Sequence, residues 1–317
     1  MQSRALDRPL ITRINWRDYL VYVGFVLIFL FFAITLRDSG FTTPNNLLNI
    51  ARQTAIIATM AVAMTFVIAA GQIDLSVGAI AGLASVTTAM AIARFGIVAG
   101  ILVGLLTGLV VGGLNGLLVT RLVIPSFLVT LGMMGVARGT AMWITDTAPV
   151  PILDQTYNAA FGSGSVGPVP SLLIWIIVVT IIGYVVLRKT PYGRQVLATG
   201  GNEQAARFSG VNTSRIVFLV LTVSGVVSAL AGMLYAGRLQ SGRFQWGEGD
   251  ELSVIAAVVL GGTSLFGGSG SVIGSVLGAL LIGVVNNGLI LMGLETSQQI
   301  IIRGAIIIVA VALARRR

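Results

Sequence analysis

Six polar side chains stand within or beside long apolar stretches of the sequence, where charged and amide groups are expensive and often functional. These residues are Asp74, Asn115, Arg138, Asn286, Asn287 and Arg303. Carboxylate, guanidinium and amide groups can hydrogen-bond a polar solute, so we take the six as candidates for lining a substrate pathway. Each has a structural alternative. A carboxylate can satisfy a helix N-terminus, an arginine can extend towards the surface, and an asparagine can bond between helices.

Catalytic chemistry is restricted by what the chain lacks. It contains no histidine, no cysteine and a single lysine, Lys189. These absences exclude a Ser-His-Asp triad, a thiol nucleophile, a disulfide and a histidine-based zinc site. A phosphate-binding GxxxxGK[ST] loop needs lysine after glycine, whereas Lys189 follows Arg188. With no paired carboxylates in one apolar stretch either, a membrane enzyme is disfavoured and no metal site is expected.

The elements that hold these residues are predicted by composition. Of 317 residues, 56% are hydrophobic and 10% are charged, against about 25% charged in soluble domains. A bilayer core requires about 20 apolar residues per helix. Such windows occur at 19–36, 48–70, 75–93, 96–119, 124–144, 171–187, 214–236, 252–266, 271–292 and 298–314. We therefore expect an all-α polytopic integral membrane protein of about ten transmembrane helices, forming a single domain over 1–317. The eighth window is short and runs into the glycine-rich stretch 261–270, so a broken or re-entrant helix is expected there.

The charge distribution predicts the orientation. With ten spans beginning inside, 13 of the 20 Lys and Arg residues lie on the cytoplasmic side, as the positive-inside rule requires. Both termini, including a tail over 1–18, are then cytoplasmic. Trp143, Trp175 and Trp246 fall near the outer interface, and Trp16 near the inner one. The net charge of +9 thus reflects topology rather than nucleic-acid binding.

Two longer polar connections interrupt the spans. The outer loop at 145–170 carries four prolines, which predicts turns and no extended helix. The inner loop at 188–213 contains Gly200-Gly201 followed by Asn202, a good N-cap for a short helix over 203–209 that Gly210 closes.

A helix of about two turns is unstable alone in water and needs a docking partner. Glu203 suits the positive end of its dipole. The small Ala205 and Ala206 permit close contact, and Phe208 offers an apolar anchor. The alternative is an ordinary basic loop between two spans.

Three short sequence motifs occur twice in the chain and indicate an internal repeat. Asp74-Leu-Ser-Val, Asn115-Gly-Leu and Arg138-Gly recur in the same order as Glu251-Leu-Ser-Val, Asn287-Gly-Leu and Arg303-Gly. The two acids begin the third and eighth predicted spans, and this odd offset predicts an inverted repeat, a common plan in transporters. Coincidence among common apolar words is the alternative.

Glycines recur every four residues along the fourth predicted span, on one helix face. They are Gly100, Gly104, Gly108, Gly112 and Gly116, and a weaker version occurs at Gly270, Gly274 and Gly278. Such strips let another helix approach closely in lipid, so we expect tight helix packing here rather than a channel lining.

An outer patch follows the seventh predicted span. It consists of Arg238, Arg243, Trp246, Glu248, Asp250 and Glu251. Exposed arginine, tryptophan and acids together suit contact with another protein, although a solvated loop is the alternative.

Several segments resemble a known family. GNEQAARFSGV at 201–211 resembles the cytoplasmic coupling motif of ABC importer permeases, with Gln204 where the general motif has alanine. The chain further resembles the ribose/xylose/galactose-type monosaccharide permease family over nearly its whole length. The matching segments, in that family's order, are GQIDLSVGAIAGL at 71–83, NGLLVTRLVIPSFLVTLGMM at 115–134, TPYGRQVLATGGNEQAARFSGV at 190–211 and VVLGGTSLFGGSGSVIGSVLGALLIGVVNNGL at 258–289.

This resemblance implies a pathway subunit of an ATP-driven importer for a monosaccharide or related polyol, in the bacterial inner membrane. It implies a second permease subunit, identical or different, and two separate ATPase subunits that use ATP and Mg²⁺, so that this chain itself binds no cofactor. It also implies a periplasmic or lipid-anchored sugar-binding protein on the outer side.

The resemblance also implies roles for residues. The ATPase-coupling candidates are Tyr192, Gly193, Arg194, Asn202, Glu203, Ala205, Ala206, Arg207, Phe208 and Gly210. The binding-protein contact candidates are Arg238, Arg243, Trp246, Glu248 and Asp250. The competing hypothesis is a self-contained, proton-coupled secondary sugar transporter that uses Asp74. A single intramembrane acid without a histidine relay argues against it.

Overall fold

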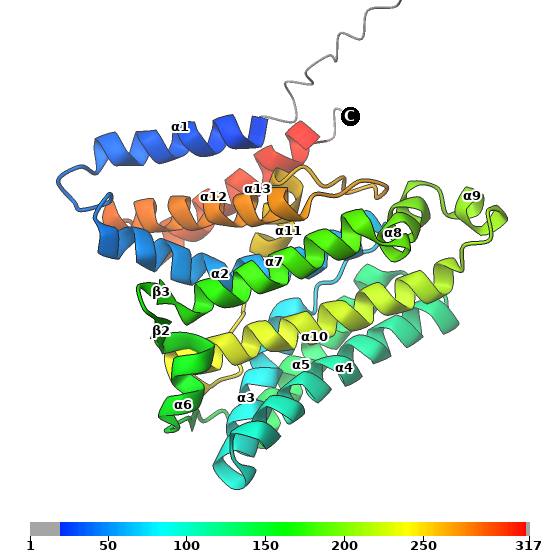
Figure 1. Cartoon of the computed structure of the whole chain (residues 1–317), viewed down its shortest axis with the longest axis horizontal. Coiled ribbons are helices and arrows are strands. Elements are labelled where there is room, and N and C mark those ends of the chain that lie inside the picture. Colours follow the sequence, from blue (N-terminus) through cyan, green and yellow to red (C-terminus); the bar gives the residue numbers. More distant parts are fainter. Residues whose placement is uncertain (1–19, 315–317) are drawn as a thin grey trace, which may run out of the picture.

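The structure is a computed structural model that describes residues 20–314. The predicted tail 1–18, Trp16 and the last three arginines lie outside this range. The helices are α1 (Leu20–Thr35), α2 (Pro44–Ala69), α3 (Val77–Phe95), α4 (Ile97–Arg121), α5 (Ser126–Thr145), α6 (Gln155–Asn158), α7 (Ser171–Lys189), α8 (Pro191–Gly201), α9 (Glu203–Phe208), α10 (Thr213–Leu239), α11 (Asp250–Leu260), α12 (Val272–Leu291) and α13 (Thr296–Ala314). They form one bundle (Figure 1).

Each of the ten apolar windows coincides with a helix, which confirms the all-α prediction. Within the described residues, seven helices are long and apolar enough to cross a membrane: α2, α3, α4, α5, α7, α10 and α12. Helix α1 has 16 residues and α11 has 11. The total of ten spans therefore stays a prediction.

Helix α11 shows the expected break. It ends at Leu260, and the chain stays irregular until α12 begins at Val272. Eleven residues span only about 16 Å, about half of an apolar bilayer core.

Glycine strips pack the helices together, as expected. A Cβ on Gly104 would overlap the Thr88 hydroxyl of α3, and a Cβ on Gly108 would overlap the Gly225 carbonyl of α10. In the weaker strip, Gly278 meets the backbone of Ala257 in α11, and Gly274 meets the backbone of Gly261 directly after α11. These close approaches explain why side chains are absent along the strips.

The helix contacts follow the sequence repeat. In the first half, α3 packs on α4 and α5, and in the second half α11 packs on α12 and α13. Helix α10 packs on α3 and α4, just as α2 packs on α11 and α12. Exchanging α2–α5 with α10–α13 thus preserves these contacts among the eight helices.

The outer loop contains turns and short pieces, as its prolines predict. Helix α6 leads into a π-helical turn, η2 (Ala159–Ser163). Two-residue strands pair β1 (Val150–Pro151) with β4 (Ser241–Gly242), and β2 (Ser165–Val166) with β3 (Val169–Pro170). The Tyr157 hydroxyl donates to the Met233 carbonyl at 3.0 Å. This buried bond fixes the loop on α10.

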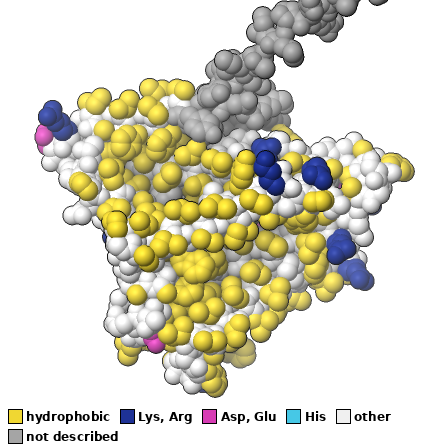
Figure 2. All heavy atoms as spheres, in the orientation of Figure 1, with side chains coloured by type: hydrophobic (Ala, Val, Ile, Leu, Met, Phe, Trp, Pro, Cys, Tyr) yellow, Lys and Arg dark blue, Asp and Glu magenta, His cyan; other side chains and the backbone are white. Residues whose placement is uncertain are grey.

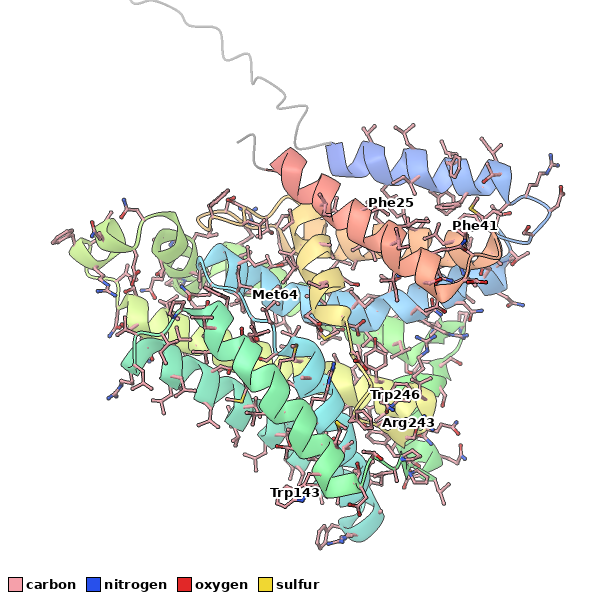
Figure 3. All side chains as sticks on the ribbon, turned by 180° about the vertical axis from the view of Figure 1, so that it is seen from behind. Phe25, Phe41, Met64, Trp143, Arg243 and Trp246 are labelled. Carbon is pink, nitrogen blue, oxygen red and sulfur yellow. The ribbon has the colours of Figure 1, made fainter. Side chains whose placement is uncertain are left out.

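The distribution of hydrophobic and charged side chains on the surface is consistent with a protein embedded in lipid. Figure 2 shows a broad hydrophobic face, with most of the visible Lys and Arg side chains gathered towards the end that carries α8 and α9. Trp143, labelled at the far end of α5 in Figure 3, is 81% exposed.

Candidate functional site

The inner loop contains two consecutive helices where sequence reasoning expected one. The predicted short helix is α9: the Asn202 side chain accepts a hydrogen bond from the Ala205 amide at 2.9 Å, and Gly210 has φ of +84°. Helix α8 was not predicted. Its signals are Thr190, whose hydroxyl caps the Gly193 amide at 3.3 Å, and Pro191 at the first helical position.

Helix α9 is braced from within the chain. The Arg207 guanidinium contacts the Glu203 carboxylate at 2.6 Å, and its Nε donates to the Thr213 hydroxyl at 2.8 Å. That hydroxyl in turn donates to Glu203 at 3.0 Å. An exposed pair of this kind contributes only about 0.5 kcal/mol. Its main effect is to fix α9 against the start of α10.

The coupling candidates divide into outward-facing and inward-facing residues. Phe208 is 93% exposed at the end of α9, and Arg194, Glu203, Ala205 and Arg207 are also exposed. A large aromatic side chain left in water at a helix end is available to a partner.

The inward-facing residues support this surface. Gly193 and Ala206 are buried against the chain itself, and Tyr192 is half-buried, its ring stacked on Phe66 at 6.4 Å. Burial raises the pKa of Tyr192 to about 12.

A second site is the connector between α2 and α3, residues 70–76, in which Asp74 is completely buried. One carboxylate oxygen accepts from the Ser76 amide at 2.9 Å and the Ser76 hydroxyl at 2.6 Å. The other accepts from the Ser224 hydroxyl of α10 at 2.7 Å, and Asn115 of α4 donates to Ser76 at 2.9 Å. Asp74 and Asn115 thus join the connector to two helices in this conformation.

The connector's backbone is satisfied by α5. The Ser126 hydroxyl accepts from the Ile73 amide at 3.1 Å, and the Thr130 hydroxyl accepts from the Leu75 amide at 3.0 Å. Irregular backbone is tolerated at membrane depth only where protein groups satisfy it. The connector is therefore held in a defined conformation by hydrogen bonds to α5.

The outer patch is also organised. Arg138 of α5 pairs with Glu248 at 2.9 Å, which joins a pathway candidate to a binding-protein candidate. The Arg243 guanidinium lies 5.6 Å from the Trp246 ring, and Figure 3 shows the two side by side. The Trp246 indole donates to the Ser241 carbonyl at 2.8 Å.

The remaining patch residues are less exposed. Asp250 is buried and accepts from the Tyr235 hydroxyl, while Arg238 and Glu251 are half-buried. The exposed residues of the patch are therefore Arg243 and Glu248, with the half-buried Trp246 between them in the sequence.

The last pathway candidates lie on α12 and α13. Asn287 exchanges two hydrogen bonds with Asn46 of α2, each 2.9 Å, so it bonds between helices. Asn286 is half-buried and points about 100° away around the helix. Arg303 lies on α13, but its side chain is outside the described residues. Among residues 20–314, no three His, Cys, Asp or Glu side chains gather in a way that could hold a metal ion.

Comparison with known proteins identifies the family to which this helix bundle belongs. The family described as "Branched-chain amino acid transport system / permease component" matches residues 46–311. The ribose import permease protein RbsC of Bacillus subtilis is 43% identical over 293 residues, which cover 92% of this chain and 91% of that protein. No solved structure matches the chain.

Further relatives agree with this result. RbsC of Escherichia coli (strain K12) is 39% identical over 300 residues, covering 92% of each chain. The L-arabinose ABC transporter permease protein AraH of Azospirillum brasilense is 38% identical over 301 residues, covering 93% of this chain and 87% of that protein. These matches favour an importer permease over a self-contained secondary transporter.

Seven membrane-length helices within residues 20–314, together with this sequence likeness, lead to one conclusion: the chain belongs to the permease-component family of ABC importers, and it is a multi-pass membrane permease rather than an enzyme.

Proposed function

We propose that this permease imports a monosaccharide, of the pentose type that its ribose and arabinose relatives are named for, or a related polyol. It works in the bacterial inner membrane as ten spans in an inverted repeat, with both termini cytoplasmic. Two permease subunits, identical or different, form the pathway. The observation that carries the proposal is the exposed α8–α9 unit at the basic end of a chain that is similar to sugar permeases over about nine tenths of its length.

In this mechanism the ATPase subunits bind ATP and Mg²⁺, and this chain supplies the docking surface. Phe208 inserts into a cavity of the ATPase, and the Glu203–Arg207–Thr213 brace holds α9 in the docking orientation. Closure of the ATPase dimer displaces α8 and α9, and the bundle changes between outward-open and inward-open states. The solute shifts this equilibrium only through its different affinity for the two states.

On the outer side, a sugar-binding protein docks on the patch around Arg243, Trp246 and Glu248. Aromatic and arginine side chains are favoured at protein interfaces. Of the five pathway candidates whose side chains are described, Asn286 and Arg138 are only partly buried, so we take these two as the first candidates for contact with a solute.

The decisive test is reconstitution with ATPase subunits and binding proteins loaded with ribose, arabinose, xylose, galactose or inositol. We expect ATPase stimulation by one or two of these, together with uptake of the same sugar. Uphill uptake driven by a proton gradient, with no ATPase present, would contradict the proposal.

The docking surface has its own test. Phe208→Ala should lower stimulated ATPase activity at least about tenfold, as loss of an aromatic hot spot does, and Glu203→Lys should uncouple uptake while membrane insertion stays intact. Leu122→Ala is the matched control, because Leu122 is a large apolar side chain, 62% exposed, that follows the end of α4. Equal effects of the Phe208 and Leu122 substitutions would contradict docking by α9.

A further inference from the structure

Three segments distant in the sequence meet beside α8 with almost no side chains between them. We call this contact the inner seam: Gly200 at the end of α8, residues 69–71 at the end of α2, and Gly267–Gly268 in the irregular segment 261–271. A Cβ on Gly200 would overlap the Ala69 carbonyl oxygen, and a Cβ on Gly267 would lie 2.5 Å from the Gly200 carbonyl oxygen. Backbones packed this closely leave no room for independent movement.

Hydrogen bonds join the end of α2 and segment 261–271 to each other, and segment 261–271 to α7, while α8 meets both segments by close packing. The Gly268 amide donates to the Ala69 carbonyl at 3.0 Å. Arg188, at the end of α7, donates to the Gly270 carbonyl at 3.0 Å. Gly71, Gly267 and Gly268 have φ of +76°, +82° and +79°, a left-handed conformation that favours glycine. The segments are thus held in this geometry rather than merely adjacent.

Both partners of α8 at the seam lead into the interior of the bundle. Residues 70 and 71 begin the connector, which is bonded to α4, α5 and α10 through Asn115, Thr130 and Ser224. Segment 261–271 joins α11 to α12. A displacement of α8 at the seam therefore reaches the irregular segments of both halves of the repeat, since a packed interior transmits strain.

We propose that Gly200 is a positioning residue that makes α8, the end of α2 and segment 261–271 move as one body, so that the seam transmits the displacement of α8 to both halves of the bundle. This inference rests on ATPase docking at α8 and α9, as proposed above. Gly200 acts through the backbone that it touches and contacts no solute.

The first experiment leaves the seam intact. The chain has no cysteine, so pairs of spin labels can be placed on introduced cysteines at exposed positions of the complete importer: Ala198→Cys with Phe266→Cys, and Ala198→Cys with Leu122→Cys. On trapping with ATP and vanadate, we expect the 198–266 distance to stay within about 2 Å. The 198–122 distance should shift by about one helical turn, roughly 5 Å.

The outcomes are separable. If the ATPase binds and the 198–266 distance changes as much as the 198–122 distance, the seam does not move as one body and this inference is wrong. If the ATPase does not bind α8 and α9 at all, the proposed function is wrong and the inference falls with it.

The second experiment uses neighbouring glycines as a matched pair. Gly200→Ala forces a Cβ into the Ala69 carbonyl, whereas in Gly201→Ala the nearest atom, the Cα of Gly268, lies at an ordinary 3.5 Å. Both residues end the same helix, so helix propensity changes alike.

We expect Gly200→Ala to lower the ratio of sugar imported to ATP hydrolysed at least about tenfold with ATPase binding retained, and Gly201→Ala to leave that ratio unchanged. A wild-type ratio in Gly200→Ala would overturn the inference. If the Gly200→Ala chain does not assemble into the importer, the 198–266 and 198–122 spin-label distances test the inference instead.

Discussion

The sequence motifs Asp74-Leu-Ser76 and Glu251-Leu-Ser253 are nearly identical, yet they lie in different structural environments. Asp74 is completely buried before α3 begins and accepts three hydrogen bonds. Glu251 belongs to the outer patch and is half-buried within the first turn of α11. Ser76 bonds to both Asp74 and Asn115, whereas the buried Ser253 hydroxyl has no partner within the described residues.

The two environments differ because each helix begins at a different position relative to its motif. Helix α3 starts after Ser76, so the acid and serine belong to the connector and turn into the bundle. Helix α11 starts before Glu251, so the same residues lie on a regular helix. The same motif thus forms a buried hydrogen-bond network before α3 and the first turn of a helix at α11. The predictions below test this contrast.

Removing the buried carboxylate should have the largest effect. Asp74→Ala leaves the Ser76 and Ser224 hydroxyls and the Ser76 amide without an acceptor, each costing about 1–3 kcal/mol when buried. We expect the free energy of unfolding to fall by about 3 kcal/mol, measured by thermal unfolding in detergent. Glu251→Ala, the control, should change it by less than about 1 kcal/mol. Equal losses would remove the contrast.

The paired serines come next. Ser76→Ala breaks a hydrogen bond to a carboxylate and one from an amide, so it should cost about 2 kcal/mol. Ser253→Ala removes a buried hydroxyl that has no partner in the described residues, so it should be neutral or slightly stabilising. The same unfolding assay applies to both variants. A loss at Ser253 that matches the loss at Ser76 would show that its hydroxyl is bonded after all.

Asp74→Asn separates hydrogen bonding from charge. The amide keeps an acceptor for Ser76 and gains a donor towards Ser224, so we expect a loss of about 1 kcal/mol. ATP-driven uptake should be retained in the reconstituted complex, with Glu251→Gln as the control. Loss of uptake in a stable Asp74→Asn protein would instead support proton chemistry at this carboxylate.

The smallest effect is expected at the outer patch. Arg138 and Glu248 have side chains 28% and 55% exposed, and pairs of this kind contribute about 0.5 kcal/mol. A double-mutant cycle with Arg138→Gln and Glu248→Gln should give that coupling in low salt, and high salt should abolish it. A coupling above about 2 kcal/mol would place this pair on a level with the Asp74 network and remove the contrast between rim and interior.

Much of the fold was predictable because apolar length is a local property. The windows around α2, α4, α7 and α10 follow from stretches of about 20 mainly apolar residues each. The α9 cap at Asn202 follows from residue types alone. Helix α8 was missed because its glycines at positions 193, 200 and 201 are typical of turns.

The candidate site was less predictable. Arg138 and Glu248 belonged to different hypotheses until the structure paired them. The Ser126 and Thr130 bonds to the connector, and the seam at Gly200, depend on helices more than 50 residues apart. No local pattern specifies which distant backbone a hydroxyl or a bare glycine will meet.

The sequence by itself determined that this chain is a membrane protein and where its short helix α9 begins, because hydrophobic length and helix capping each act within a few turns. The tertiary structure decided that Asp74 is a buried lock, that Asn287 joins two helices and that Gly200 touches the end of α2. In an interior without water, a polar group takes whichever partner the packing brings within 3 Å, and only the folded bundle fixes that choice.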